Sequence, residues 1–432
     1  MKILSSQNLS FKQDLAKLLA FETVNDPSVL QTVDTIIAQV RNGGDTAVLT
    51  LTQQFDAHPA TSFAELMVSP SQLKSAFDEL SAEIKSALTL AAQRIEYFHQ
   101  RQLQQSWTYQ DELGNTLGQK VTPLARVGIY VPGGLASYPS SVLMNAIPAK
   151  VAGVKEIIMV VPAPKGQLNP LVLAAAYLAG VNKVYTIGGA QAIAALAYGT
   201  QSIPKVDKIT GPGNKYVAAA KRAVFGQVGI DMIAGPSEVL VYAEGTDKDR
   251  ADWLAMDLIA QAEHDKVAQA IFVTTSQLLL EQVQNEIEKA LETLPKADIA
   301  RTSIQNRSAL ILVEDRAEGI AIINQIAPEH LELSVDDPEA MLEHIDNAGA
   351  VFMGRYTPEP IGDYCAGPNH VLPTSGTARF SSPLGVYDFQ KKTSIIGCTK
   401  EGSQLLARTA DILAVQENLD AHAQSARYRV EN

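Results

Sequence analysis

The sequence predicts an α/β protein with two Rossmann-like parallel-sheet domains and with helical extensions at both ends of the chain. From Arg126 onward, short apolar runs with β-branched residues alternate with alanine-rich helical runs, which is typical of parallel sheets wrapped by helices. The alternation restarts near Glu238, which indicates a second sheet. The length of 432 residues corresponds to about three average domains.

Each block supplies the elements of one sheet. In the first block the expected strands are 127–131, 156–161, 184–189, 205–211 and 229–235, and the expected helices are 142–153, 171–180, 190–199 and 214–226. In the second block the expected strands are 238–244, 269–275, 308–314, 331–335 and 350–354, and the expected helices are 249–264, 278–294, 315–325 and one that runs through Leu342. We therefore expect two successive βα units, 126–236 and 238–355.

The remaining segments complete the organisation. Residues 71–100 carry apolar side chains at helical spacing, and we expect the N-terminal helices to pack on the second sheet. Residues 100–115 are expected to form a connection with a small hairpin. Residues 356–398 are rich in Pro, Gly, Ser and Thr, which predicts a long functional loop. The expected domains are an N-terminal helical arm (1–24), a larger α/β domain (25–125 with 237–383), a Rossmann-like domain (126–236) and a C-terminal helical tail (384–432).

Composition excludes several classes of function. Lys and Arg number 35 against 47 Asp and Glu, and the net charge of −12 argues against nucleic acid or an anionic membrane as a partner. No apolar run approaches the roughly 18 residues of a membrane helix, and the N-terminus shows no secretion signal, so we expect a cytoplasmic protein. Cys365 and Cys398 are too few for a thiolate zinc site.

Two sites near the second sheet combine histidine with other polar groups. Gln261 and His264 lie three residues apart near a helix end, so they share one face and suit two ligands of one metal, or simply a polar helix end. Glu329 and His330 lie at a helix-to-strand corner after Pro328. They could divide acid–base work, although neighbours in an extended segment point to opposite faces unless a turn intervenes.

Further candidates lie in the long loop and the tail. Asp363 and His370 are framed by glycines in the irregular segment, where functional groups often sit, although ordinary turn chemistry explains them equally. His422 follows Glu417 by five residues. A helix break at 418–420 would bring the two onto a common side; otherwise His422 is an exposed tail histidine.

Two glycine turns precede helices of the first block. Gly188-Gly189 and Gly211-Pro212-Gly213 both lie where a strand leads into a helix, where free N–H groups favour a phosphate. Neither turn is a G-x-G-x-x-G fingerprint, and no acidic residue at the usual distance completes one. From the pattern alone, these glycines either bind a dinucleotide or simply allow the chain to turn from strand to helix.

Eight sequence blocks together resemble the histidinol dehydrogenase family. They run in order and with conserved spacing through nearly the whole chain: RVGIYVPGG (126–134), IGGAQAIAALAYGT (187–200), KITGPGNKYV (208–217), AGPSEVLV (234–241), QAEH (261–264), APEHLEL (327–333), GDYCAGPNHVLPT (362–374) and ENLDAH (417–422). The resemblance implies NAD-dependent oxidation of L-histidinol to L-histidine through the aldehyde, the last steps of histidine biosynthesis.

The resemblance also implies roles for single residues. Gln261, His264, Asp363 and His422 would bind one Zn²⁺ per subunit; the zinc would hold the substrate. His330 would act as general base and Glu329 would activate water. Substrate contacts would come from Ser237, His370, Glu417, His330 and the four zinc ligands, and NAD contacts would come from Tyr130, Gln191 and Asn214.

The same resemblance implies a homodimer. The tail and the N-terminal arm would reach across to the partner, so that His422 and Glu417 complete the partner's site. The domain 126–236 would bind NAD, and the larger domain would carry the metal and the catalytic residues. Two alternatives remain open: a zinc-dependent dehydrogenase of another amino alcohol, and a metal-binding dimer without activity.

Overall fold

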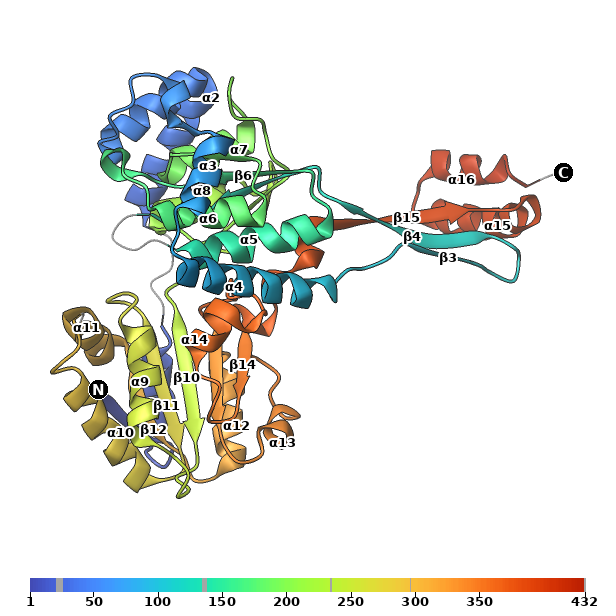
Figure 1. Cartoon of the computed structure of the whole chain (residues 1–432). Helices are drawn as coiled ribbons and strands as arrows, with labels where there is room; N and C mark the ends of the chain where they lie inside the picture. The colour runs from blue at the N-terminus through green and yellow to red at the C-terminus, as the bar shows by residue number, and fades with distance from the viewer. Residues whose placement is uncertain (21–25, 134–137, 234, 296, 431–432) are drawn as a thin grey trace.

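The computed structural model describes residues 1–20, 26–133, 138–233, 235–295 and 297–430. These residues form two α/β bodies, here named the upper and the lower body after their places in Figure 1, and an extension that projects from the upper body. Within the described residues there are two six-stranded sheets and one three-stranded sheet. The predicted α/β class with two Rossmann-like sheets is confirmed.

The upper body contains the first expected βα block. Its sheet has the order β2-β7-β6-β5-β8-β9, in which β2 alone is antiparallel. Its strands are β2 (Met67–Val68), β5 (Arg126–Tyr130), β6 (Glu156–Val160), β7 (Lys183–Tyr185), β8 (Lys208–Thr210) and β9 (Gly229–Ile230), and its crossover helices are α5 (Pro139–Ala152), α6 (Pro170–Ala179), α7 (Gly189–Tyr198) and α8 (Lys215–Val224). The strand order reverses between β5 and β8, as in a Rossmann fold.

The N-terminal helices pack on this upper sheet. They are α2 (Pro27–Asp56), α3 (Pro70–Asp78) and α4 (Ala82–Gln100). Val33 of α2 belongs to the same core cluster as Ile158, while Ile95 of α4 belongs to the cluster of Ile157 on the opposite face. The expected grouping of 25–125 with 237–383 is therefore wrong for these helices. Ile157 and Ile158 are neighbours in β6 and point to opposite faces of the sheet, and both are buried. Helix α4 helps to cover one face, and α2 helps to cover the other.

The lower body repeats the same strand order. Its sheet is β1-β12-β11-β10-β13-β14, and all neighbouring strands are parallel. Its strands are β1 (Lys2–Ser5), β10 (Glu238–Ala243), β11 (Gln269–Thr274), β12 (Ala309–Leu312), β13 (His330–Ser334) and β14 (Ala350–Met353), and its main helices are α9 (Ala251–Ala262), α10 (Gln277–Ala290), α11 (Ala297–Arg307), α12 (Arg316–Ile326) and α13 (Pro338–Leu342). The second predicted block thus forms its own sheet.

The start of the chain is part of the lower body. β1 pairs with β12, and helix α1 (Phe11–Leu18) buries Leu15 in the cluster that contains Leu240. The expected helical arm 1–24 is therefore wrong for residues 2–18, because an apolar edge strand and an amphipathic helix find their partners in the same chain.

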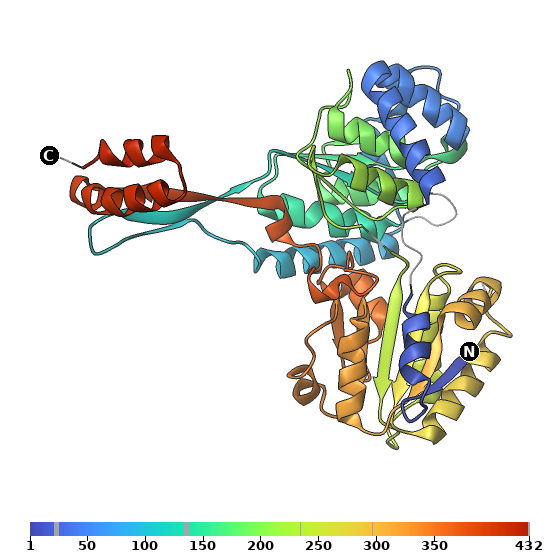
Figure 2. The ribbon, with the colours of Figure 1, turned by 180° about the vertical axis from the view of Figure 1, so that it is seen from behind.

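The extension combines a hairpin with the C-terminal tail. It consists of β3 (Trp107–Gln110), β4 (Thr116–Pro123), β15 (Gln390–Gly397), α15 (Lys400–Gln416) and α16 (Asp420–Arg427), and Figures 1 and 2 show it pointing away from both bodies. Part of the expected irregular segment 356–398 is therefore a strand, since β15 pairs antiparallel with β4. The expected helix break is confirmed: Asn418 has a φ of 58° between α15 and α16. No described helix is long and apolar enough to cross a membrane.

Candidate active site

His330 begins strand β13 at the amino edge of the lower sheet, and Glu329 directly precedes it. Helix α12 ends at Ile326, its C-cap Ala327 has a φ of 53°, and the side chains of Glu329 and His330 beyond it are both buried. The neighbouring strand β10 binds both of them through its first residue. The Glu238 N–H donates to Glu329 Oε2 over 2.9 Å, and His330 Nδ1 donates to the Glu238 carbonyl over 2.8 Å. A carboxylate and an imidazole, the usual acid–base pair, are thus held side by side.

The end of helix α9 brings Gln261 and His264 to the same place. His264 Nδ1 lies 2.8 Å from Gln261 Oε1, as their spacing predicts. Gln261 Nε2 donates to Glu359 Oε1 over 3.2 Å and lies 3.3 Å from His330 Nδ1. Gln261 is fully buried, so its amide is held between a carboxylate and an imidazole and cannot turn freely.

The segment 362–370 directly after helix α14 (Glu359–Ile361), here called the Asp363 loop, begins with a π-helical turn over Gly362–Ala366 and contributes Asp363 and His370. Asp363 Oδ1 lies 3.3 Å from His330 Nε2, and the Asp363 carbonyl accepts a hydrogen bond of 3.0 Å from His370 Nδ1. His370 Nε2 lies 3.4 Å from the Ser141 hydroxyl of α5 in the upper body. The loop is therefore held at the junction of the two bodies.

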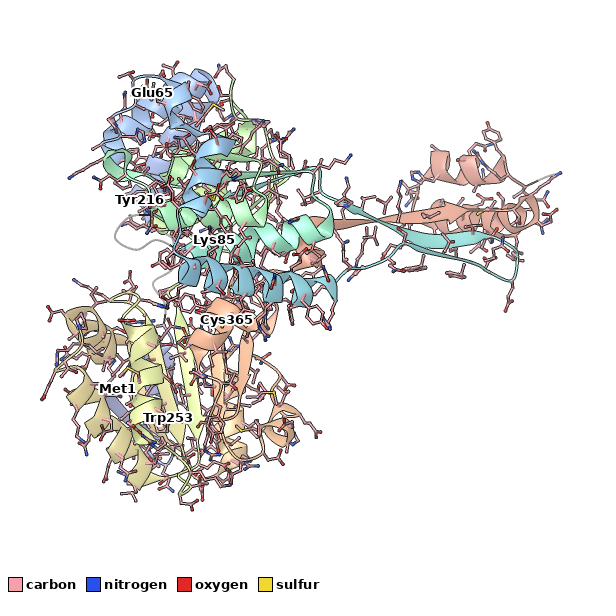
Figure 3. The ribbon with its side chains drawn as sticks, in the orientation of Figure 1. Met1, Glu65, Lys85, Tyr216, Trp253 and Cys365 are labelled. Atoms are coloured by element: carbon pink, nitrogen blue, oxygen red, sulfur yellow. The ribbon has the colours of Figure 1, made fainter. Side chains whose placement is uncertain are left out.

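Helix α4 anchors this loop from the upper body. Arg94 Nε donates to the Cys365 carbonyl over 2.7 Å, and Arg94 Nη2 donates to the Ala366 carbonyl over 3.1 Å. Figure 3 shows Cys365 directly below α4, where the two bodies meet. The conformation of the Asp363 loop thus depends on both bodies.

Burial makes this cluster unusual in its protonation. It raises the pKa of Glu329 to about 8 and the pKa of Glu238 to about 7, and it raises the pKa of Glu359 to about 7. Burial alone favours the neutral imidazole of His330, but the carboxylates of Glu359, Glu329 and Asp363 outweigh it and raise the His330 pKa well above its ordinary value. The carboxylates of Glu238 and Glu359 also repel that of Glu329, and a bound cation would relieve this repulsion.

The geometry fits a cation. Donor atoms of His330, Glu359 and Asp363 lie within 4.8 Å of one another. This trio overlaps the expected ligand set only at Asp363, although Gln261 and His264 border it through the contacts above. Nitrogen and oxygen donors suit zinc as well as harder cations.

The remaining expected substrate residues are distributed unevenly. Ser237 directly precedes β10 and Glu238, and its carbonyl accepts a 2.9 Å hydrogen bond from the Gln269 N–H. Glu417 and His422 lie on the extension, exposed and far from the Asp363 loop (Figures 1 and 2). Within one chain, the structure therefore does not bring these two residues to the site.

The three expected cofactor residues lie at the carboxyl edge of the upper sheet. Tyr130 ends β5, its hydroxyl accepts a 3.2 Å hydrogen bond from the Gly189 N–H, and burial raises its pKa to about 12. Asn214 caps α8, where its Oδ1 accepts from the Tyr216 N–H over 3.0 Å. Gln191 is buried in α7, and its Oε1 has no hydrogen-bond partner among the described residues. A buried acceptor left open is a place for a ligand donor.

Comparison with known proteins decides the family. The profile of the histidinol dehydrogenase family matches residues 20–430. The histidinol dehydrogenase of Psychrobacter arcticus is 73% identical over 99% of this chain and 100% of its own length, and that of Acinetobacter baylyi is 72% identical over 99% of both. The crystal structure of histidinol dehydrogenase from Elizabethkingia anophelis superposes with a TM-score of 0.92 at 36% identity, covering 99% of this chain and 98% of that one. The chain belongs to the histidinol dehydrogenase family.

Two acidic residues of this family member were not among the expected site residues. Glu359 lies in Pro358-Glu359-Pro360, inside the segment expected to be irregular, and Glu238 is the first residue of β10. Both are buried. Glu238 had a detectable signal, because a carboxylate that opens an otherwise apolar strand needs a buried partner. Glu359 had none, because proline-flanked acidic residues are common in surface turns.

Proposed function

We propose that this chain catalyses the NAD-dependent oxidation of L-histidinol to L-histidine through L-histidinaldehyde, with zinc in its site. Histidinol dehydrogenases carry out the last step of histidine biosynthesis, and the chain is a full-length relative of them. The observation that carries the proposal is the burial of Glu329 and His330 side by side, within one cluster that also contains Gln261 and Asp363. Oxidation of an alcohol and then of a hydrated aldehyde requires such a pair.

His330 is proposed as the general base, acting through Nε2. Its Nδ1 donates to the Glu238 carbonyl, so in the neutral ring Nε2 carries the lone pair. A proton taken from the substrate hydroxyl at Nε2 is stabilised by the Asp363 carboxylate 3.3 Å away. The backbone contact thus sets the tautomer, and the carboxylates of Glu359, Glu329 and Asp363 together raise the basicity of the ring.

Glu329 is proposed to activate the water that adds to the aldehyde. The Glu238 N–H donates to its Oε2, and burial raises the pKa of Glu329 to about 8, so its deprotonated form is a stronger base toward water than an exposed carboxylate. Ser237 and His370 are proposed to contact the substrate from the edges of the same cluster. Both side chains are half-buried. Ser237 directly precedes Glu238 of β10, and His370 bonds to the Asp363 carbonyl.

Gln261, His264, Asp363 and His422 are proposed as the zinc ligands. The donor chemistry fits, because Glu359 binds the Gln261 amide nitrogen and leaves the oxygen directed toward His264. Bound zinc would supply a positive charge that grips the imidazole and amine of the substrate. Glu359 itself lies close enough to join or replace a ligand.

Tyr130, Gln191 and Asn214 are proposed to bind NAD at the switch point of the upper sheet. NAD would accept a hydride in each of the two oxidations. The open acceptor of Gln191 supports this role, since ribose hydroxyls and the nicotinamide amide group are donors.

We also propose a homodimer in which the extension of one subunit completes the site of the other. The extension carries His422 and Glu417 and exposes many large apolar side chains, among them Ile396, Leu405, Leu406, Ile412, Leu413 and Tyr428. Such a surface is typical of a protein interface. A heterodimer of a His422→Ala chain and an Asp363→Ala chain should regain activity, because one of its two sites is intact.

The decisive experiment measures NADH formation with histidinol, with and without a chelator, beside zinc analysis. Simple amino alcohols that lack the imidazole serve as control substrates. We expect the enzyme to oxidise histidinol but not the control amino alcohols, and to lose this activity when the chelator removes zinc. Equal turnover of the control amino alcohols would instead favour a dehydrogenase of another substrate, and a heterodimer no more active than either parent would mean that the site is built within one chain.

A further inference from the structure

A buried ion pair lies behind a glycine turn of the upper body. Lys221 of α8 and Asp231, which follows β9, are bonded to each other, and their side chains are 3% and 1% exposed. Burying two charges costs desolvation energy that only good geometry and further hydrogen bonds offset. The further hydrogen bonds of this pair identify what it holds.

Both members of the pair bind Gly211. Lys221 Nζ donates to the Gly211 carbonyl over 2.9 Å, and Asp231 Oδ2 accepts from the Gly211 N–H over 2.7 Å. Gly211 has a φ of 108°, and a Cβ atom there would lie 2.0 Å from the Tyr130 carbonyl oxygen. The glycine is therefore pressed against the end of β5 and gripped at both of its polar backbone groups.

The position of Gly211 links this pair to the cofactor site. Gly211 directly follows β8, which lies beside β5 at the switch point of the sheet, and Asn214 caps α8 three residues later. The turn 211–214 thus packs against Tyr130 at Gly211 and ends with Asn214, and both Tyr130 and Asn214 are proposed to contact NAD. We infer that Lys221 and Asp231 are positioning residues for NAD, which fix the turn 211–214 against Tyr130. This inference rests on the cofactor site proposed above.

An ion pair on the other end of the same strand provides a matched control. Lys208 begins β8 and bonds to Asp388 over 2.8 Å, with side chains 14% and 23% exposed. It lies at the amino edge, away from Gly211. Lys208→Met removes a partly buried lysine from the same strand without touching the turn.

The test is a fluorescence titration of the zinc-loaded protein with NADH. Lys221→Met and the neutral double variant Lys221→Met/Asp231→Asn should raise the NADH dissociation constant by about tenfold or more, as expected for a binding turn that loses its alignment. The KM for histidinol and the zinc content should stay unchanged. Lys208→Met should bind NADH like the unmodified chain. Lys221→Met leaves the Asp231 carboxylate buried without its partner, and this single variant could unfold for that reason. The double variant removes both charges, so it keeps the test valid in that case.

Separate outcomes overturn separate claims. Unchanged NADH affinity in folded Lys221 variants, together with weaker binding by Gln191→Ala, refutes the positioning role alone. Unchanged affinity in Gln191→Ala and Tyr130→Phe as well refutes the cofactor site itself. One measurement needs no variant: the Gly211 amide should exchange its hydrogen slowly in the unmodified chain, and exchange at the rate of an exposed turn would contradict the grip of Asp231.

Discussion

The two sheets of this protein share one strand order, yet they carry their chemistry at opposite edges. The expected cofactor residues lie at the carboxyl ends of the upper strands, where open α/β sheets normally bind ligands. In the lower body, Glu329 and His330 stand at the amino ends of β13 and β10. Topology alone therefore does not locate a site.

Ion pairs explain part of this difference. At the carboxyl edge of the lower sheet, Arg355 bonds to Asp249 over 2.7 Å and also to Asp336, and Arg316 bonds to Glu244. These charges are satisfied by each other. At the amino edge, the carboxylates of Glu329, Glu359 and Asp363 surround the imidazole of His330, so that edge retains capacity for a cation and a substrate.

The largest expected effect separates the two edges. His330→Gln should lower kcat by about 10²–10⁴-fold, because it removes a general base. NADH affinity, measured by fluorescence titration, should not change, because the cofactor residues lie on the other sheet. A large loss of NADH affinity in this variant would mean that the two edges do not act independently.

Glu329→Gln sharpens the comparison within the lower edge. We expect oxidation of the aldehyde to fall by about 10²-fold or more, and oxidation of the alcohol to fall less, because only the second step needs activated water. Histidinol and histidinaldehyde are assayed separately with the same enzyme preparation. Equal losses in the two half-reactions would contradict the division of roles between Glu329 and His330.

Gln191→Ala tests the upper edge. The KM for NAD should rise by about tenfold, the effect of one lost hydrogen bond to a buried acceptor, while kcat at saturating NAD and zinc content remain near their original values. Asn324, whose hydrogen bonds join α12 to residues 344–347 of the lower body, offers a control as Asn324→Ala, because it lies in a different body from the cofactor residues. If both variants raise the KM equally, the effect of Gln191 is not specific.

The smallest expected effect concerns stability and pH. In the metal-free chain the carboxyl of Glu329 keeps its proton up to about pH 8, whereas in the unfolded chain it loses the proton near its ordinary value of 4.5. Between these values the folded state binds more protons, so the free energy of unfolding falls as the pH rises. Glu329→Gln should flatten this slope in urea denaturation series. A slope as steep as that of the unmodified protein would show that other groups set it.

Local patterns predicted much of the fold and part of the site. The alternation of short apolar runs with helical runs predicted the strands and helices of both blocks. The i, i+3 spacing of Gln261 and His264 predicted that their side chains share one helix face, and the structure shows a contact of 2.8 Å between them. The rule of alternating faces left Glu329 and His330 unresolved. In the structure both are buried, and both bond to Glu238 of the neighbouring strand β10.

Long-range packing was the part that the residues did not encode locally. The helices of 27–100 were assigned to the wrong sheet, because an apolar helix face fits either apolar sheet surface until the competing helices are placed. Glu359 was missed for a related reason: its burial depends on Gln261 and Glu332, both distant in the chain, the latter accepting from its backbone N–H over 2.7 Å.

By itself, the sequence determined the α/β class, the two parallel sheets, the family and which residue types are available for chemistry, since these follow from short-range periodicity and from motifs. Only the tertiary structure decided which edge of each sheet is used, that Asp363 approaches His330, and that the tail carrying His422 points away from the body of its own chain. The physical reason is that these features depend on contacts between segments far apart in the chain, where burial and charge are set jointly by all the elements that meet.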